Sequence, residues 1–159
     1  MPTISQRIRV SSPYGRAPSY LSWYLDTLGK DADGKTILRL QAPLQHAGLP
    51  TGLVLAKDVT ASFDYIDDPN SLEHKIKVHW EPEGGGPYPT FDGWIGISAD
   101  EDYGASWLVI EGDYTPPLGP VGALFDLAIG NKIAQATGRE LLERLRDAME
   151  LAHRNAIVH

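Results

Sequence analysis

Apolar and polar residues alternate along several stretches of the chain, which is the pattern of a strand with one buried face. The clearest stretch is 4–10, where Ile4, Ile8 and Val10 alternate with polar side chains. Turn residues divide these stretches at the spacing typical of an antiparallel meander. The stretches that we predict to form strands are 4–10, 36–40, 53–65, 74–80, 91–99 and 105–114.

Two further stretches have helical spacing instead. Aromatic and aliphatic residues predict a short helix over 19–28, and Pro120 suits the first turn of a long helix that continues to about residue 152. The apolar residues of the long helix form two stripes roughly 130° apart, at about 100° per residue. Gly130 and Gly138 lie between the stripe centres. We therefore predict a bend between these glycines, because one straight helix could not bury both stripes against one sheet.

The two faces of the predicted strands differ in chemistry, since side chains alternate across a strand. One face is apolar and should be covered by the long helix. Its polar groups are the hydroxyls of Tyr65 and Tyr114 and the indole N–H of Trp80. The other face is mostly charged or hydroxylated, with Trp94 and Trp107 as its main apolar members. A buried wall and a solvent-facing wall are therefore expected.

Length, charge and composition limit which kinds of protein this chain can be. The 159 residues suit one domain, which we place at 1–155, with a tail at 156–159. The formal net charge of −7 repels phosphate backbones, so we expect no nucleic-acid partner. The chain has no cysteine, which is typical of a reducing compartment. We find no stretch with the length of a signal peptide or membrane span, and so expect a cytoplasmic protein without membrane insertion.

The junction between the last predicted strand and the long helix has a distinctive sequence. It reads Glu111-Gly-Asp-Tyr-Thr-Pro-Pro-Leu-Gly-Pro-Val-Gly122, followed by Leu124-Phe-Asp126. With the order of elements, this junction resembles the START-like or SRPBCC superfamily, also called the polyketide cyclase and lipid-transport superfamily. The resemblance spans nearly the whole chain and implies an α+β helix-grip fold, in which a curved antiparallel β-sheet wraps around a long C-terminal α-helix. The chain departs from the family in having one predicted N-terminal helix where the family usually has two.

The resemblance also implies a cavity between the sheet and the last helix for a lipid, isoprenoid or polyketide-like molecule. The predicted apolar wall would bury such a ligand but supplies no general acid or base. We therefore expect a binding or carrier protein for an apolar small molecule rather than an enzyme. We expect no cofactor and no metal, since the five histidines lack metal-binding spacing. The residues expected to line the cavity are Phe63, Tyr65, Trp80, Ile95, Ile110, Tyr114 and Phe125.

Three alternatives stay open. The first is an aromatase, cyclase or dehydratase that uses Tyr65, Tyr114 or His79 for proton transfer, where His79 faces inward only if its strand shifts by one residue. The second is an interaction domain with a closed cavity, in which Trp94 and Trp107 form a homodimer contact. The third is a lipocalin-type barrel, which the long helix, the few strands and the missing Gly-x-Trp signature disfavour.

Overall fold

The computed structural model describes residues 3–43, 54–66, 74–84, 88–101, 103–115 and 127–158. Within these ranges the predicted elements form. Their described ends are shifted by three residues at most, except that the long helix ends at Val158 rather than near 152. The elements are β1 (Thr3–Val10), α1 (Ala17–Thr27), β2 (Thr36–Pro43), β3 (Val54–Ile66), β4 (His74–Pro82), β5 (Thr90–Ala99), β6 (Ser106–Thr115) and α2 (Leu127–Val158).

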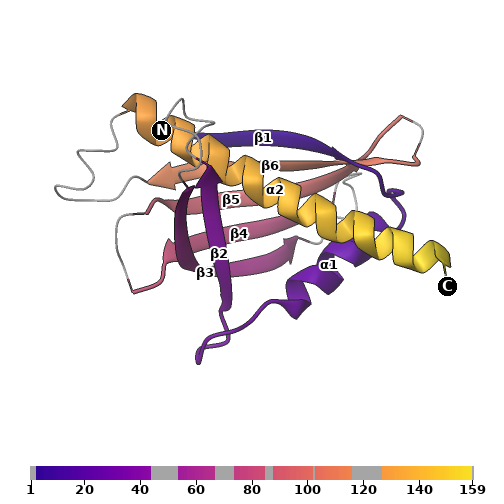
Figure 1. The fold of residues 1–159 in the computed structure, drawn as a ribbon, viewed down its shortest axis with the longest axis horizontal. Helices are drawn as coiled ribbons and strands as arrows, with labels where there is room; N and C mark the ends of the chain where they lie inside the picture. Colours follow the sequence, from indigo (N-terminus) through magenta and orange to yellow (C-terminus); the bar gives the residue numbers. More distant parts are fainter. Residues whose placement is uncertain are drawn as a thin grey trace.

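The six strands form one antiparallel sheet in the order β1-β6-β5-β4-β3-β2. β1 and β2 are therefore its two edges, and α2 contacts both of them. Figure 1 shows α2 passing across the open side of the curled sheet, with α1 beneath its C-terminal half. This arrangement confirms the α+β helix-grip fold. The helix occupies the gap that would otherwise leave both sheet edges open.

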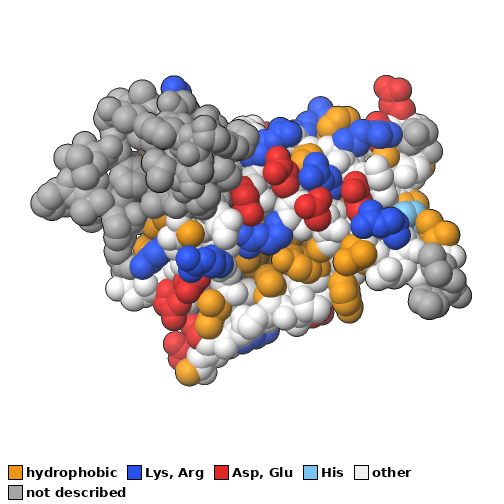
Figure 2. Space-filling view, in the orientation of Figure 1, with side chains coloured by type: hydrophobic (Ala, Val, Ile, Leu, Met, Phe, Trp, Pro, Cys, Tyr) orange, Lys and Arg blue, Asp and Glu red, His pale blue; other side chains and the backbone are white. Residues whose placement is uncertain are grey.

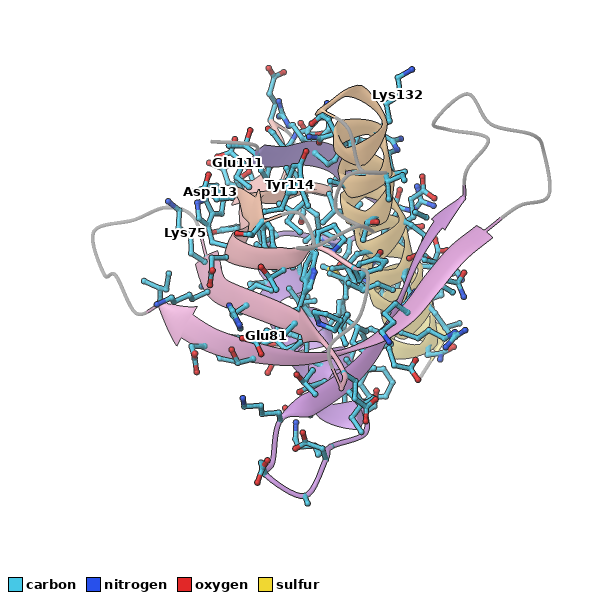
Figure 3. The ribbon with its side chains drawn as sticks, turned by 90° about the vertical axis from the view of Figure 1, so that its left-hand side faces the viewer. Lys75, Glu81, Glu111, Asp113, Tyr114 and Lys132 are labelled. Atoms are coloured by element: carbon cyan, nitrogen blue, oxygen red, sulfur yellow. The ribbon has the colours of Figure 1, made fainter. Side chains whose placement is uncertain are left out.

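The predicted inner face of the sheet is buried over most of its area. Its residues meet across the strands in register, as where Ile95 pairs with Ile76 on one side and Ile110 on the other. Leu142 and Leu145 of α2 belong to the same buried core. Figure 3 shows the alternation directly: Tyr114 projects from β6 toward α2, whereas its neighbours on β6, labelled Glu111 and Asp113, project to the other side.

A pair of glycines gives the core room for its largest rings. Gly93 of β5 faces Gly112 of β6, and a Cβ at Gly93 would collide with the carbonyl of Glu111 and the ring of Phe91. The Phe91 ring fills the space that a side chain would need, and it stacks on Trp80 with centroids 4.4 Å apart. The glycines therefore permit an aromatic layer against bare backbone.

The predicted bend in the long helix is wrong. α2 runs from Leu127 to Val158 as one helix that includes Gly138, and Figure 1 shows it as a single rod. The first of the two predicted stripes lies mostly outside the described residues. Gly138 serves a different purpose, since a Cβ there would come within 2.7 Å of Ile4 Cγ2 on β1. The glycine allows α2 to approach the edge strand closely.

Side chains of α2 also bind the exposed edge of β1. The Gln135 Oε1 accepts hydrogen bonds from the backbone N–H of Ser5 at 3.1 Å and from Gln6 Nε2 at 2.9 Å, while Gln135 Nε2 donates to the Thr3 carbonyl at 2.6 Å. Near the other end of β1, a Glu150 carboxylate oxygen accepts from the Ser11 N–H at 2.7 Å. Helix side chains thus take the place of a neighbouring strand.

The opposite face of α2 is charged. Figure 2 shows acidic and basic side chains interspersed along it. Two ion pairs of this helix are Arg139–Glu143 and Arg144–Glu140, at 3.2 and 2.9 Å. Both pairs are spaced four residues apart, which supports an exposed helix face by a few tenths of a kcal/mol, about 0.3–0.5 per pair. α2 is therefore amphipathic, with one face toward the core and one toward solvent.

Candidate functional site

Four of the residues predicted to line a cavity belong to the packed core. Trp80, Ile95, Ile110 and Tyr114 expose at most 4% of their surface. The Trp80 indole N–H donates to the Pro89 carbonyl at 3.2 Å, so its polar group is already satisfied. Burial raises the pKa of the Tyr114 hydroxyl. In the part of the chain that the structure describes, all four side chains belong to the buried core cluster.

The other predicted residues lie elsewhere. Phe63 is half-buried against the core, whereas Tyr65, two residues further along β3, is 58% exposed. Tyr65 is the second-last residue of β3, and alternation alone overestimated its burial. Phe125 lies outside the described residues. Among the pockets formed by described residues, Phe63 and Tyr65 contribute to the lining of one.

The first pocket lies between the N-terminal end of α1 and the ends of β3, β4 and β5. It encloses about 260 Å³. Its walls are largely apolar, with His74 and Lys75 as the polar members. The residues that line it are Pro18, Tyr65, Ile66, His74, Lys75, Ile76 and Ile97. We call it the Pro18 pocket.

The second pocket lies between the C-terminal end of α1, the turn that follows it, and β3. It encloses about 230 Å³ and is more polar at its rim, which carries Lys30 and Lys35. Its lining also includes an apolar part. The residues that line it are Leu25, Asp26, Lys30, Asp33, Gly34, Lys35, Thr36, Ala61, Ser62, Phe63, Asp64 and Tyr65. We call it the Leu25 pocket.

One face of α1 forms a wall of both pockets. Pro18 and Leu25 are seven positions apart, which returns to within about 20° of the same direction and advances about 10 Å along the helix. α1 packs chiefly against α2, where the Tyr20 hydroxyl lies 3.3 Å from Nδ1 of His153. α2 thus holds α1 above the sheet. We call the two pockets under this helix, with Tyr65 between them, the α1 groove.

The turn at the Leu25 end of the groove is ordered by the side chain of Asp31. The Asp31 carboxylate accepts hydrogen bonds from the N–H groups of Asp33 and Lys35 at 3.0 and 2.9 Å, and Gly34 has a φ of +80°. Asp31-Ala-Asp-Gly34 is therefore a turn of the type that aspartate and glycine favour. Among the described residues, no group of three or more His, Cys, Asp or Glu side chains is arranged to hold a metal ion.

His79 lies on the outer face of the sheet, so its strand is not shifted. Asp92 accepts from Nδ1 at 2.5 Å and Glu81 from Nε2 at 3.0 Å. Ser62 is the cross-strand neighbour of His79, and the row Ser62–His79–Asp92 has the residue types of a hydrolase triad. However, Nε2, the nitrogen that would activate the serine, is engaged by Glu81. His79 is therefore placed as one member of an ion cluster on the outer face.

Trp94 and Trp107 on the outer face are covered by cations of this same chain. The Lys75 ammonium lies 4.4 Å from the Trp94 ring centre, and the Arg7 guanidinium lies 3.9 Å from that of Trp107. The Trp107 indole N–H also donates to Asp100 at 3.3 Å. Cation–π contacts of this kind account for the half-buried state of both indoles within the protomer.

One buried polar pair gave no signal in the sequence. The Tyr88 hydroxyl and Thr137 Oγ1 lie 2.8 Å apart, and Thr137 donates to the Ile133 carbonyl at 2.8 Å. Both residues are about 2% exposed, and burial raises the pKa of Tyr88 to about 12. Tyr88 stands between two prolines in a stretch that reads only as a turn. This pair fastens the approach to β5 onto α2.

Comparisons with known structures support the fold. The structure matches a protein from Thermus thermophilus with a TM-score of 0.54 and 16% identity, over 95% of this chain and 99% of that one. It matches a conserved protein from Geobacillus kaustophilus with a TM-score of 0.58 and 15% identity, over 95% and 97%. A START superfamily protein from Mycobacterium smegmatis is also among the structures found, with a TM-score of 0.45 and 16% identity over 97% and 98%.

Searches by sequence give no family assignment. No model of a known protein family matches the chain, and no curated protein matches it. None of the described helices has the combination of length and apolar composition needed to span a membrane. The likeness to the Thermus and Geobacillus proteins is therefore a likeness of fold, and the function has to be argued from the structure itself.

Proposed function

We propose that this chain binds an apolar or amphipathic small molecule in the α1 groove. The observation that carries the proposal is the pair of pockets under α1, whose floor includes the aliphatic side chains of Leu25, Ile76 and Ile97. Apolar walls of this kind gain free energy by removing a ligand from water, at about 25 cal/mol per Å² of apolar surface. A few polar groups at the rim then orient the ligand.

The groove differs in place from the cavity expected from the sequence. Trp80, Ile110 and Tyr114 are packed between the sheet and α2, so a ligand among them would have to displace close-packed core side chains. The α1 groove is already open. Phe63 and Tyr65 keep the binding role expected of them, while Ile95 stands behind the groove as the cross-strand partner of Ile76.

Binding is favoured over catalysis by the position of the charged groups. The ionisable side chains of the groove lie at its rim, as Asp26, Lys30 and Lys35 do at the Leu25 end. The apolar floor has no acid or base among its described residues that is desolvated and aimed at a ligand, which general acid–base catalysis needs. We therefore propose carriage or sensing of the ligand rather than its conversion.

Titration with the neutral dye Nile red, followed by its fluorescence, tests this proposal. We expect saturable binding at one site per chain. Ile66→Glu should weaken it at least tenfold, because it places a charge in the Pro18 pocket. Ile157→Glu is the matched control, since Ile157 is exposed near the end of α2, and it should leave the affinity unchanged.

Two results would count against the proposal. Either the dye fails to bind saturably, or the two glutamate variants weaken binding equally. Native mass spectrometry of the protein purified from its own host adds an independent readout, because a carrier retains part of its natural ligand.

A further inference from the structure

Tyr65 separates the two pockets of the α1 groove. It is the one residue among the described lining of both the Pro18 pocket and the Leu25 pocket. Pro18 lines the first pocket and Leu25 the second, seven positions apart on one face of α1. The two pockets therefore adjoin at Tyr65.

The volumes of the two pockets limit how a ligand can bind without contacting Tyr65. At about 260 and 230 Å³, each half is smaller than the ~300–1,000 Å³ of ordinary small-molecule sites, whereas together they enclose roughly 500 Å³. A ligand confined to one half would bury little apolar surface. A ligand of ordinary size has to occupy both halves, and therefore the position of the Tyr65 ring.

Tyr65 is weakly restrained. Its side chain is 58% exposed, and within the described part of the chain no hydrogen bond holds its hydroxyl. Exposed side chains change rotamer within picoseconds to nanoseconds, so the ring has access to solvent-facing positions without disturbing the core. Its β3 neighbour Phe63 is in contrast half-buried and packed against the core cluster. Of the two aromatic residues, Tyr65 is the one free to move.

The chemistry along the groove indicates the shape of the ligand. The lining includes aliphatic side chains, with Ile76 as the cross-strand partner of Tyr65 and Leu25 on α1. Polar groups line both pockets as well: Lys30 and Lys35 the Leu25 pocket, His74 the Pro18 pocket. We propose that Tyr65 is a movable partition and that the groove takes one elongated amphiphile, with a single apolar chain lying along α1 past Tyr65 and its polar group at a rim. This inference rests on the proposed binding function.

A chain-length series tests the partition. Short, medium and long n-alkylphosphocholines, each below its critical micelle concentration, are titrated into the protein by calorimetry. In Tyr65→Ala the affinity should rise steadily with length, by about fourfold per added CH₂ group until the groove is full. In the wild-type protein the rise should pause where the chain first meets the ring. Long chains should therefore bind about tenfold more tightly to Tyr65→Ala than to wild type, and short chains equally.

Three further variants sharpen the result. Tyr65→Trp should weaken long chains selectively, because the larger ring is harder to displace, and Tyr65→Phe should match the wild type. Trp23→Ala removes a 60%-exposed aromatic residue from another face of α1 and should change nothing. Thermal unfolding of each variant verifies that it is folded.

The outcomes distinguish this inference from the proposed function. If Tyr65→Ala shifts all chain lengths equally or none, the partition is overturned while binding in the groove stands. If Nile red binds but alkylphosphocholines of every length do not, the class of ligand is wrong. If neither binds, the proposed function fails together with the inference.

Discussion

His79 shows how single residues on the outer face contribute to the protein. Its ring nitrogens face Asp92 and Glu81, in side chains that are 36%, 70% and 55% exposed. Partial burial lowers the pKa of His79, and it is the largest single effect. The hydrogen bonds and negative charges of Asp92 and Glu81 together outweigh it, so the net pKa is raised above 6.5. The two carboxylates therefore favour the protonated His79 ring, in which both nitrogens carry a hydrogen and donate.

This pKa makes stability depend on pH. Because the folded-state pKa of His79 exceeds the unfolded value of 6.5, its contribution is fully present below pH 6.5 and is lost as the pH rises through the folded value. We expect His79→Gln to lower the free energy of unfolding by at most about 1 kcal/mol near pH 5.5, since the cluster is solvent-exposed, and by less near pH 8.5. Denaturant titrations at both pH values measure the difference.

Asp92→Asn supplies the control for His79. In that background the pH dependence of the His79→Gln effect should shrink, because one of the two carboxylates that raise the pKa is gone. A His79→Gln effect that is constant with pH, or larger at alkaline pH, would show that the ring is not held in its protonated form.

At the scale of the elements, the contact between α2 and the edge strand β1 offers the clearest test of stability. β1 is an edge strand, and Gln135 of α2 binds both the N–H of Ser5 and the carbonyl of Thr3. Gln135→Ala should destabilise the fold by about 0.5–1.5 kcal/mol, because it removes the hydrogen bonds of two exposed edge groups, which water can partly replace. Hydrogen exchange of the Ser5 amide should accelerate by more than that of Ser11, which Glu150 binds.

Two substitutions separate the roles of the Gln135 side chain. Gln135→Glu keeps the acceptor for Ser5 but places a carboxylate oxygen against the Thr3 carbonyl, so it should recover only part of the loss. Asn131→Ala removes a residue that bonds to Gln135 rather than to β1, and should cost less than Gln135→Ala. Equal protection of the Ser5 amide in wild type and Gln135→Ala would contradict this account.

The elements were predictable to different degrees. Strand positions follow from alternation, as in 4–10, because burial of one face imposes a period of two. The error at Gly138 has a physical cause: the low helix propensity of glycine is a local property, whereas its role here is the close approach of Ile4, which lies more than a hundred residues away in sequence. A contact between residues so far apart in sequence cannot be predicted from local sequence patterns.

At the scale of the whole molecule, the buried core and the proposed binding site lie in different places. Trp80 and Ile110 are buried in the core that the sheet and α2 build, and the proposed binding space lies under α1. The sequence indicated an apolar interior, but it could not show which part of that interior stays unfilled. That depends on how far α2 holds α1 from the sheet. Tyr65 was expected at the site because strand alternation places it on the inner face of the sheet. The proposal instead rests on its exposed side chain and on its place in the lining of both pockets.

The most direct test of the account is a crystal structure of the chain with a long n-alkylphosphocholine bound. The account predicts the alkyl chain under α1, in contact with Pro18 and Leu25, with the Tyr65 ring turned out of the groove and Trp80 unmoved. An alkyl chain found among Trp80 and Ile110, or on the outer face of the sheet, with Tyr65 still between the two pockets, would contradict it.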